Sequence, residues 1–338
     1  MTPGRPAPAT LSVVVALGTV YVVWGSTYLA IAYVVETLPP FLAAGARFLL
    51  AGGMLVAFLL AQHQWRRQRG TPSSLPAPRL VEWRTALVVG GLLLLGGNGM
   101  VMTAEQTIPS GIAAVIIATV PIWMSLFDAV LTRRRPSALA VGGLVVGLVG
   151  VAILLLPTEG ISALDPLGIG MLVLATISWA AGSLYARRGP LPSNQLLGTG
   201  MQQLAGGTLL VLVALAVGDV GRLDLAGVST ESWLGLAFLV VFGSLIAYTA
   251  FVWLLNNVAV TTVSTYAYVN PIVAVALGLL FRGESLTPRT LLAAALIIGA
   301  VVAMVTGRPK QAEDAGMAPE AAVVDAGERG DDAREALT

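Results

Sequence analysis

Three charged side chains interrupt apolar stretches of the sequence, and their types indicate what chemistry they could do. Glu105 and Asp128 are carboxylates inside or at the end of apolar runs, and Arg47 is a guanidinium inside another run. A buried carboxylate can exchange a proton near neutral pH, because burial raises its pKa. A buried guanidinium can hold a carboxylate through two parallel hydrogen bonds. The sequence therefore predicts coupling or gating roles for Arg47, Glu105 and Asp128.

Each of these charges also has a structural interpretation. Arg47 lies seven residues after Pro40, which is roughly 10 Å into a helix by the helical rise. It could form an ion pair with Glu105 on the same side of the membrane, and such a pair could also break and re-form as a gate. Asp128 could be neutralised by the three arginines at 133–135, about 7 Å further along its helix. Both interpretations stay open at this point.

Aromatic, amide and hydroxyl side chains recur on single faces of several apolar segments. Trp24 and Trp179 lie well inside their segments, so lining a cavity suits them better than anchoring at the membrane surface. Apolar walls with a few neutral polar groups suit an amphipathic small molecule, and they suit phosphorylated compounds poorly because Arg47 alone offers a buried positive charge. We therefore predict a binding site that contains Trp24, Tyr28, Asn98, Met102, Trp179, Ser183, Tyr248, Tyr266 and Asn270.

Pro121 and Pro271 lie inside apolar segments that otherwise have the pattern of continuous helices. A proline inside a helix leaves one carbonyl without its hydrogen bond and bends the helix. These two positions are hinges if the helices move against each other, and they are packing kinks if the bundle is static.

Composition indicates which elements hold these side chains. The 338 residues are 56% hydrophobic and 11% charged, with a mean hydropathy of +0.84, whereas a soluble domain is about one quarter charged. Apolar runs of about 20 residues must be helical in a membrane, because hydrocarbon offers the backbone no hydrogen-bond partner. The sequence predicts an all-α membrane protein with ten transmembrane helices, at 11–35, 41–61, 85–106, 112–131, 138–156, 166–186, 194–217, 232–255, 261–281 and 289–306.

Loop charges orient the predicted bundle. Arginines concentrate in the loop 62–84 and at 133–135 and 187–188, which all fall on one side of a ten-helix bundle. Because cytoplasmic loops carry the excess of basic residues, we place both termini in the cytoplasm. Residues 1–10 then form a short cytoplasmic N-terminus. Residues 307–338 are acidic and poor in apolar side chains, so we predict a disordered cytoplasmic tail.

The two halves of the chain align with each other at a spacing of about 150 to 155 residues, so that Trp24 matches Trp179. The predicted halves are 11–156 and 166–306. Each half has five predicted helices, an odd number, so the second half must be inserted upside down relative to the first. Inverted repeats of this kind are typical of transporters and put the binding site near the midplane of the membrane.

Several short motifs of this chain resemble one known family. They are Trp24-Gly25-Ser26-Thr27-Tyr28, Pro39-Pro40 with Arg47-Phe48 and Ala51-Gly52, Gly97-Asn98-Gly99-Met100 with Ala104-Glu105, Pro109-Ser110-Gly111, Ala118-Thr119-Val120-Pro121, and residues 264–271. Together they resemble the drug/metabolite transporter superfamily, and within it the EamA-domain exporters of the YedA type. The likeness extends from about Leu11 to Thr306. The resemblance implies two EamA repeats, a bacterial inner-membrane location and the export of small metabolites.

These expectations lead to one function and two alternatives. We predict a secondary transporter that exports small amphipathic metabolites or drugs, amino-acid-like or hydrophobic, by alternating access, with proton coupling as an option. The alternatives are a facilitative uniporter without ion coupling and a membrane receptor or assembly factor that transports nothing. The predicted partners are a small-molecule substrate, the lipid bilayer and, with coupling, protons; a monomer and a homodimer are both compatible with the sequence.

Residues that other classes of protein require are scarce. The chain has no cysteine, its single lysine is Lys310, and its single histidine is His63 in a basic loop. A nucleotide-binding P-loop needs a lysine after a glycine-rich turn, and zinc sites need clusters of histidine or cysteine. The sequence therefore predicts no cofactor, no metal site, no enzymatic activity and no nucleic-acid partner.

Overall fold

The computed structural model describes residues 9–71, 75–131, 133, 138–155, 164–258, 260–263, 265–283 and 287–306. Within these ranges every regular element is a helix, as the composition predicts. The elements are α1 (Thr10–Thr37), α2 (Pro40–Gln68), α3 (Leu80–Val89), η1 (Gly90–Gly99), α4 (Met100–Ala104), α5 (Ser110–Ile117), α6 (Val120–Leu131), α7 (Ala138–Leu155), α8 (Pro166–Arg188), α9 (Gln195–Ala216), η2 (Asp219–Arg222), α10 (Thr230–Phe238), η3 (Leu239–Ala247), α11 (Tyr248–Asn257), α12 (Val260–Val263), α13 (Tyr266–Arg282) and α14 (Pro288–Thr306). The predicted tail, 307–338, and residues 1–8 of the predicted N-terminal segment lie outside the described residues.

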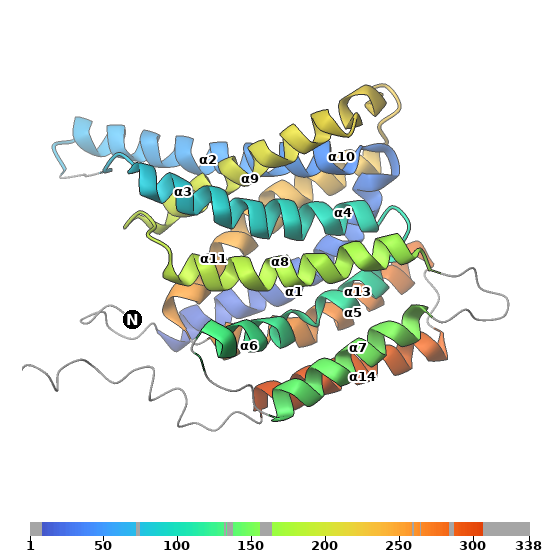
Figure 1. The fold of residues 1–338 in the computed structure, drawn as a ribbon. Helices are drawn as coiled ribbons and strands as arrows, with labels where there is room; N and C mark the ends of the chain where they lie inside the picture. Colours follow the sequence, from blue (N-terminus) through green and yellow to red (C-terminus); the bar gives the residue numbers. More distant parts are fainter. Residues whose placement is uncertain are drawn as a thin grey trace, which may run out of the picture.

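The helices are arranged as a membrane-spanning bundle requires. In the described part of the chain, seven helical stretches are long and apolar enough to cross a membrane: Thr10–Thr37, Pro40–Gln68, Leu80–Ala104, Ser110–Leu131, Pro166–Arg188, Gln195–Ala216 and Thr230–Asn257. The other three predicted spans fall on α7, α13 and α14, which have 17 to 19 residues. All lie alongside one another, with their ends gathered at two opposite faces (Figure 1). Large apolar side chains such as Phe58 and Leu280 are exposed on the outside, a pattern that fits contact with lipid.

α2 is longer than the sequence analysis predicted. It continues past residue 61 to Gln68, because the added residues are mostly good helix formers and none of them breaks a helix. Gly70 then adopts a left-handed conformation with φ of +67°. The N–H of Thr71 donates to the carbonyl of Arg66 at 3.0 Å, which closes the helix in the manner of a Schellman motif. The basic end of α2 therefore extends beyond its apolar part.

Two predicted spans contain a π-helical segment where we expected continuous α-helix. η1 joins α3 to α4, and η3 joins α10 to α11. They begin at Gly90 and Leu239 and so occupy corresponding places in the two halves of the chain. A π-helix has a wider turn than an α-helix, and such segments occur frequently at functional sites.

The two spans that contain prolines are each divided. One separates into α5 and α6 at Ala118 and Thr119, which puts Pro121 in the first turn of α6. There its missing N–H costs little, because the first N–H groups of a helix have no acceptor within the helix. Pro271 lies inside α13, which follows the separate short helix α12. The hinge role of both prolines stays a prediction.

α2 packs against α9 along one edge of the bundle, and α7 packs against α14 along the opposite edge (Figure 1). Glycines allow the first contact to be close. A Cβ atom at Gly52 would lie 2.9 Å from the carbonyl oxygen of Gly200, and one at Gly207 would lie 2.9 Å from the backbone nitrogen of Leu49. Small residues are how membrane helices bring their backbones together.

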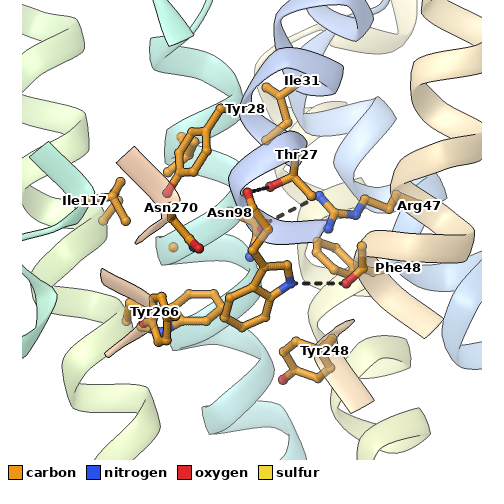
Figure 2. Close-up of a pocket in the computed structure, with 16 residues that line it drawn as sticks. Thr27, Tyr28, Ile31, Arg47, Phe48, Asn98, Ile117, Tyr248, Tyr266 and Asn270 are labelled. Carbon is orange, nitrogen blue, oxygen red and sulfur yellow. Dashed lines mark hydrogen bonds between the residues drawn. The ribbon is translucent and has the colours of Figure 1, made fainter. Parts of the chain in front are cut away.

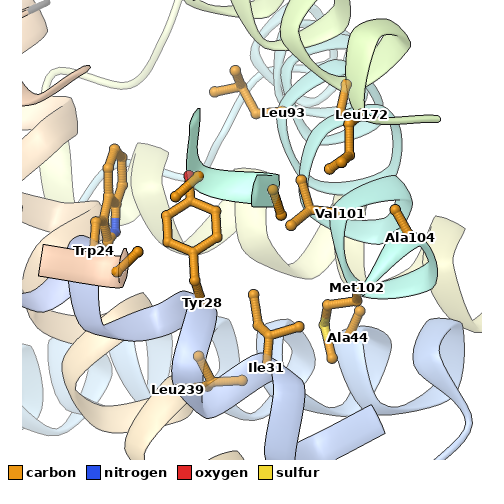
Figure 3. Close-up of a cluster of buried hydrophobic side chains, with 14 of the residues drawn as sticks. Trp24, Tyr28, Ile31, Ala44, Leu93, Val101, Met102, Ala104, Leu172 and Leu239 are labelled. Atoms are coloured by element: carbon orange, nitrogen blue, oxygen red, sulfur yellow. The ribbon is translucent and has the colours of Figure 1, made fainter. Parts of the chain in front are cut away.

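α1 runs through the interior and contacts α13, α10, η3, α11 and α5. Figure 3 shows its Trp24, Tyr28 and Ile31 in one cluster of side chains with Val101 and Met102 of α4. All five residues belong to the buried apolar core. The aromatic face of α1 is therefore presented to the centre of the bundle, where the candidate site lies.

Candidate functional site

A cavity lies inside the bundle, between helices from both halves of the chain. The space between its lining side chains, including the open mouth, is about 620 Å³. Its lining consists of Trp24, Thr27, Tyr28 and Ile31 of α1, Arg47 and Phe48 of α2, Gly97 and Asn98 of η1, Val101 of α4, Ile117 of α5, Ala175 and Trp179 of α8, Gly243 of η3, Tyr248 of α11, and Tyr266 and Asn270 of α13.

Arg47 brings a positive charge into this lining. The residue is 3% exposed; its Nε donates to Ser244 Oγ at 2.7 Å, and its Nη1 donates to Asn98 Oδ1 at 3.4 Å. Gly243 leaves room for the guanidinium, because a Cβ there would lie 2.8 Å from Nη2. An ion pair with Glu105 is one of the interpretations that the sequence leaves open, and the structure gives Arg47 neutral partners instead. Glu105 comes seven residues after Asn98, about 10 Å further along by the helical rise.

Aromatic rings form a connected cluster at the cavity. The ring of Trp24 meets those of Trp179 and Tyr266 edge to face, with centroids 5.4 Å apart in both pairs. Phe251 contacts the two tryptophans, at 4.8 and 5.6 Å, and Tyr248 lies 6.5 Å from Phe251. The tryptophans that correspond in the two halves of the sequence therefore meet in the structure. Such edge-to-face packing gives the cavity a well-ordered apolar wall.

Hydrogen bonds orient several of the polar groups around the cavity. Trp24 Nε1 donates to the carbonyl oxygen of Gly243 at 3.3 Å, and Tyr248 Oη donates to Gln202 Oε1 at 2.9 Å. The amide nitrogen of Asn270 is oriented to donate to two backbone carbonyls, at 3.1 and 3.2 Å. Buried polar groups with such partners keep one orientation, so the site is largely formed without a ligand.

The structure brings together seven of the nine residues predicted to bind a ligand: Trp24, Tyr28, Asn98, Trp179, Tyr248, Tyr266 and Asn270. The other two, Met102 and Ser183, are fully buried and lie outside the described lining. Val101 lines the cavity in place of Met102, since neighbouring helical residues point about 100° apart. Ser183 Oγ donates to the carbonyl of Trp179 at 2.8 Å, so its hydroxyl is used within its own helix.

Glu105 and Asp128 lie outside the cavity lining. Glu105 is 7% exposed and follows the last residue of α4. Asp128 pairs with Arg188 of α8 at 3.4 Å, and both side chains are about half exposed. We had expected the arginines at 133–135 as its partners; of these, only Arg133 lies within the described residues. The Arg188 contact reaches across to another helix, and sequence spacing alone does not predict it.

Sequence reasoning missed Thr27, Ile31, Phe48 and Phe251. Thr27 and Ile31 had a detectable signal, because they follow Trp24 at helical spacings of three and seven residues. Phe251 likewise follows a predicted residue by three positions. Phe48 had no such signal, since it directly follows Arg47 and adjacent helical residues point in different directions.

The sequence matches the EamA-like transporter family over residues 11–156 and 166–306. The chain belongs to this family. The resemblance that the motifs indicate is thereby confirmed, and this EamA-like transporter is a membrane transport protein.

Individual relatives support the assignment. This EamA-like transporter is 39% identical over 294 residues to YedA of Escherichia coli (strain K12), described as an uncharacterized inner membrane transporter, with 87% of this chain and 90% of YedA covered. It is 28% identical to protein PecM of Dickeya dadantii (strain 3937), over 83% of this chain and 88% of PecM. A solved crystal structure with 21% identity has a TM-score of 0.59 and covers 87% of this chain and 96% of that chain. That likeness concerns the fold alone.

Proposed function

We propose that this EamA-like transporter is a secondary transporter that exports small amphipathic molecules, amino-acid-like or hydrophobic, across a bacterial inner membrane. In this proposal ten transmembrane helices form two inverted five-helix repeats, at 11–156 and 166–306, which alternately expose the cavity to the two sides. The inner-membrane location is taken from the description of the YedA relative. The placement of both termini in the cytoplasm follows from the basic loops.

The observation that carries the proposal is a cavity that both halves of the chain enclose. Figure 2 shows Arg47 and Phe48 entering it from one side, and Tyr266 and Asn270 from the other. A site shared between two bodies changes its exposure when those bodies move against each other. Apolar and aromatic walls with a few polar groups suit an amphipathic molecule of moderate size.

Corresponding helix contacts support the inverted repeat. α1 of the first half packs against α13 of the second, and α8 of the second half packs against α6 of the first. Each contact joins the first helix of one half to the fourth span of the other half, so the two pairs are equivalent. α2 with α9 and α7 with α14 pair each helix with its own counterpart. The π-helical segments η1 and η3 also correspond. Pro121 and Pro271 are the proposed hinges, since each lies in a span that is divided near it.

Two ion pairs bridge the equivalent helix pairs at opposite faces of the bundle, and we assign them gating roles. Arg282 at the end of α13 pairs with Glu36 near the end of α1, and Arg188 at the end of α8 pairs with Asp128 of α6. Tyr33 adds a hydrogen bond from its hydroxyl to the carbonyl of Phe281 at 3.2 Å. Breaking one pair while the other forms would open the bundle on one side at a time.

Glu105 is the candidate for proton coupling in this proposal, because a carboxylate buried at the end of a membrane helix can change its protonation state during a cycle. Proton exchange there would let a pH gradient drive export. Without such exchange the protein would be a facilitative uniporter, which moves its substrate only down the substrate's own gradient.

The test is efflux from liposomes that contain the purified protein, with a panel of radiolabelled amino acids and amphipathic drugs, with and without a pH gradient. We expect Ala175→Phe to abolish efflux, because Ala175 lines the cavity and is 1% exposed. The matched control is Leu212→Phe, on the outside of α9 at 55% exposure, which we expect to transport normally. Glu105→Gln should retain efflux but lose its dependence on the gradient.

Efflux equal to that of protein-free liposomes for every compound would refute transport and favour a receptor or assembly factor. Efflux that ignores the pH gradient in both the wild type and Glu105→Gln would instead leave a facilitative uniporter and remove proton coupling.

A further inference from the structure

The guanidinium of Arg47 is a buried charge whose partners in the described part of the chain are neutral. It bonds a serine hydroxyl and an amide oxygen, and its Cζ lies 4.6 Å from the centre of the Phe48 ring. The residue is 3% exposed. Burying a charge is costly unless an opposite charge compensates it. A ligand that brings a negative charge into the cavity would supply that compensation.

Part of the guanidinium makes no hydrogen bond within the described part of the chain, and Arg47 lines the cavity. Its recorded hydrogen bonds use Nε and one N–H of Nη1. The N–H groups of Nη2 and the second N–H of Nη1 form the end of the fork, which is the edge that pairs with a carboxylate through two parallel bonds. Figure 2 shows Arg47 reaching in beside Asn98 and Thr27.

Both π-helical segments help to hold this group. Asn98 belongs to η1, and Gly243 and Ser244 belong to η3. Gly243 makes room for Nη2, since a Cβ there would lie 2.8 Å from that atom. The position of Ser244 is fixed in turn, because its backbone carbonyl accepts a hydrogen bond from Gln203 Nε2 at 3.3 Å. One helix of each half therefore positions the guanidinium from either side.

The other lining residues determine which chemical groups the rest of the ligand can carry. Among the described lining residues none is acidic, so an ammonium group would find no carboxylate. Trp24, Trp179 and Tyr266 form an aromatic part of the lining, which suits a flat or apolar body. A single guanidinium balances a single negative charge, which disfavours phosphates and dicarboxylates.

We propose that the cavity of this EamA-like transporter selects amphipathic organic monocarboxylates, with the carboxylate held by Arg47 between η1 and η3 and the apolar body on the aromatic wall. This deepens the proposed function and rests on it, since the site is the proposed transport cavity. An amine on the ligand is not needed for recognition.

Equilibrium binding to the purified protein in detergent tests this selectivity with three compounds of one shape. They are 3-phenylpropionate, its neutral amide 3-phenylpropanamide, and the cation 3-phenylpropylamine, measured by isothermal titration calorimetry. We expect the Kd of the carboxylate to be lower than that of either analogue by about tenfold or more, a difference of about 1.4 kcal/mol.

Substitutions of Arg47 test whether this side chain is the group that recognises the carboxylate. Arg47→Gln should raise the Kd of 3-phenylpropionate about tenfold and leave that of the amide unchanged, and Arg47→Lys should fall between, since it keeps the charge and loses the fork. The matched control is Arg66→Gln, an exposed arginine of the same helix, which should bind like the wild type. Size-exclusion profiles and melting temperatures verify that each variant is folded.

The inference is overturned if 3-phenylpropionate does not bind, if the amine or the amide binds equally well, or if Arg47→Gln folds and binds the carboxylate normally. Because binding is measured without a membrane, its outcome is separate from the flux assay. Arg47-dependent binding without efflux of any compound would sustain this inference and refute the proposed function.

Discussion

Individual side chains in the cavity have separable tasks. Arg47 supplies charge, whereas Trp24, Trp179 and Phe251 supply an apolar surface that their mutual ring contacts keep in place. Trp24 is also bonded to the backbone of η3 through its indole nitrogen. Because Trp179 is on the other repeat, the wall is shared between the two bodies that we propose to move.

Removing one ring of this wall should weaken binding of an apolar ligand. We expect Trp179→Ala to raise the Kd of 3-phenylpropionate by about tenfold, since aromatic contacts and apolar burial together supply about 1–3 kcal/mol. Calorimetric titration measures the change. Trp83→Ala is the control, because Trp83 is 40% exposed on α3; an equal loss in both variants would contradict the assignment of Trp179.

Asp165 makes stability depend on pH at one end of the bundle. Its carboxylate accepts hydrogen bonds from Thr107 Oγ1 at 2.9 Å and from the backbone N–H groups of Leu167 and Gly168, and these bonds hold its pKa below the ordinary value. A carboxyl group whose pKa is lowered by folding stabilises the fold above its unfolded pKa, and that stability is lost as the pH falls through the folded value.

Asp165→Asn should therefore remove part of the acid sensitivity. The wild type should lose melting temperature as the pH is lowered below about 4, and the variant should lose less over the same interval. Because asparagine also caps helices well, the two proteins should melt within about 2 °C of each other at pH 7. If the melting temperatures of the two proteins decrease equally as the pH falls, Asp165 has no such role.

At the scale of elements, ion pairs join helix ends at the two opposite faces of the bundle, where we propose gates. The pair Glu36–Arg282 joins α1 to α13, and the pair Asp128–Arg188 joins α6 to α8 at the opposite face. Partly exposed ion pairs of this kind contribute about 0–1 kcal/mol. That is enough to bias an equilibrium between two conformations and too little to lock either of them.

Breaking one pair should shift access to the cavity in the opposite direction from breaking the other. The chain has no cysteine, so Ile31→Cys in the cavity lining can be labelled from outside the cell with an impermeant maleimide. In that background Glu36→Gln should raise the labelling rate about threefold, and Arg188→Gln should lower it about threefold. Arg222→Gln is the control, because Arg222 pairs with Asp219 inside one short helix. A shift in the same direction for both pairs would contradict alternating gates.

At the scale of the whole molecule, close contact between α2 and α9 holds the two halves together. Gly52 faces the backbone of α9, whereas the neighbouring Gly53 has nothing within 4 Å of where its Cβ would be. The two glycines are therefore a matched pair, one in the interface and one outside it.

Alanine at these two positions should have opposite effects. Gly52→Ala should destabilise the protein by about 1–3 kcal/mol, because its Cβ would lie 2.9 Å from backbone atoms that cannot move independently. Gly53→Ala should be neutral or stabilise by about 1 kcal/mol, since alanine favours a helix over glycine. Melting temperatures in detergent measure both, and equal values would refute the packing argument.

Much of this architecture follows from the order of residues alone. Length and apolarity of each segment predict a helix because hydrocarbon leaves the backbone no other way to form hydrogen bonds. Helical spacing also predicted seven of the lining residues, since residues such as Trp24 and Tyr28 share a face however the helices pack. The short motifs likewise predicted the family to which the chain belongs.

Other features of the site could not be predicted from the sequence, because they depend on the tertiary structure. The partners of Arg47 lie 51 and 197 positions away in the chain, and no local pattern specifies which distant helix comes within hydrogen-bonding reach. The π-helical turns, the choice of Val101 over Met102 at the cavity and the pairing of Asp128 with Arg188 likewise depend on how helices pack. Local physics determines which segments are helices and which faces are polar, and long-range packing determines what those faces meet.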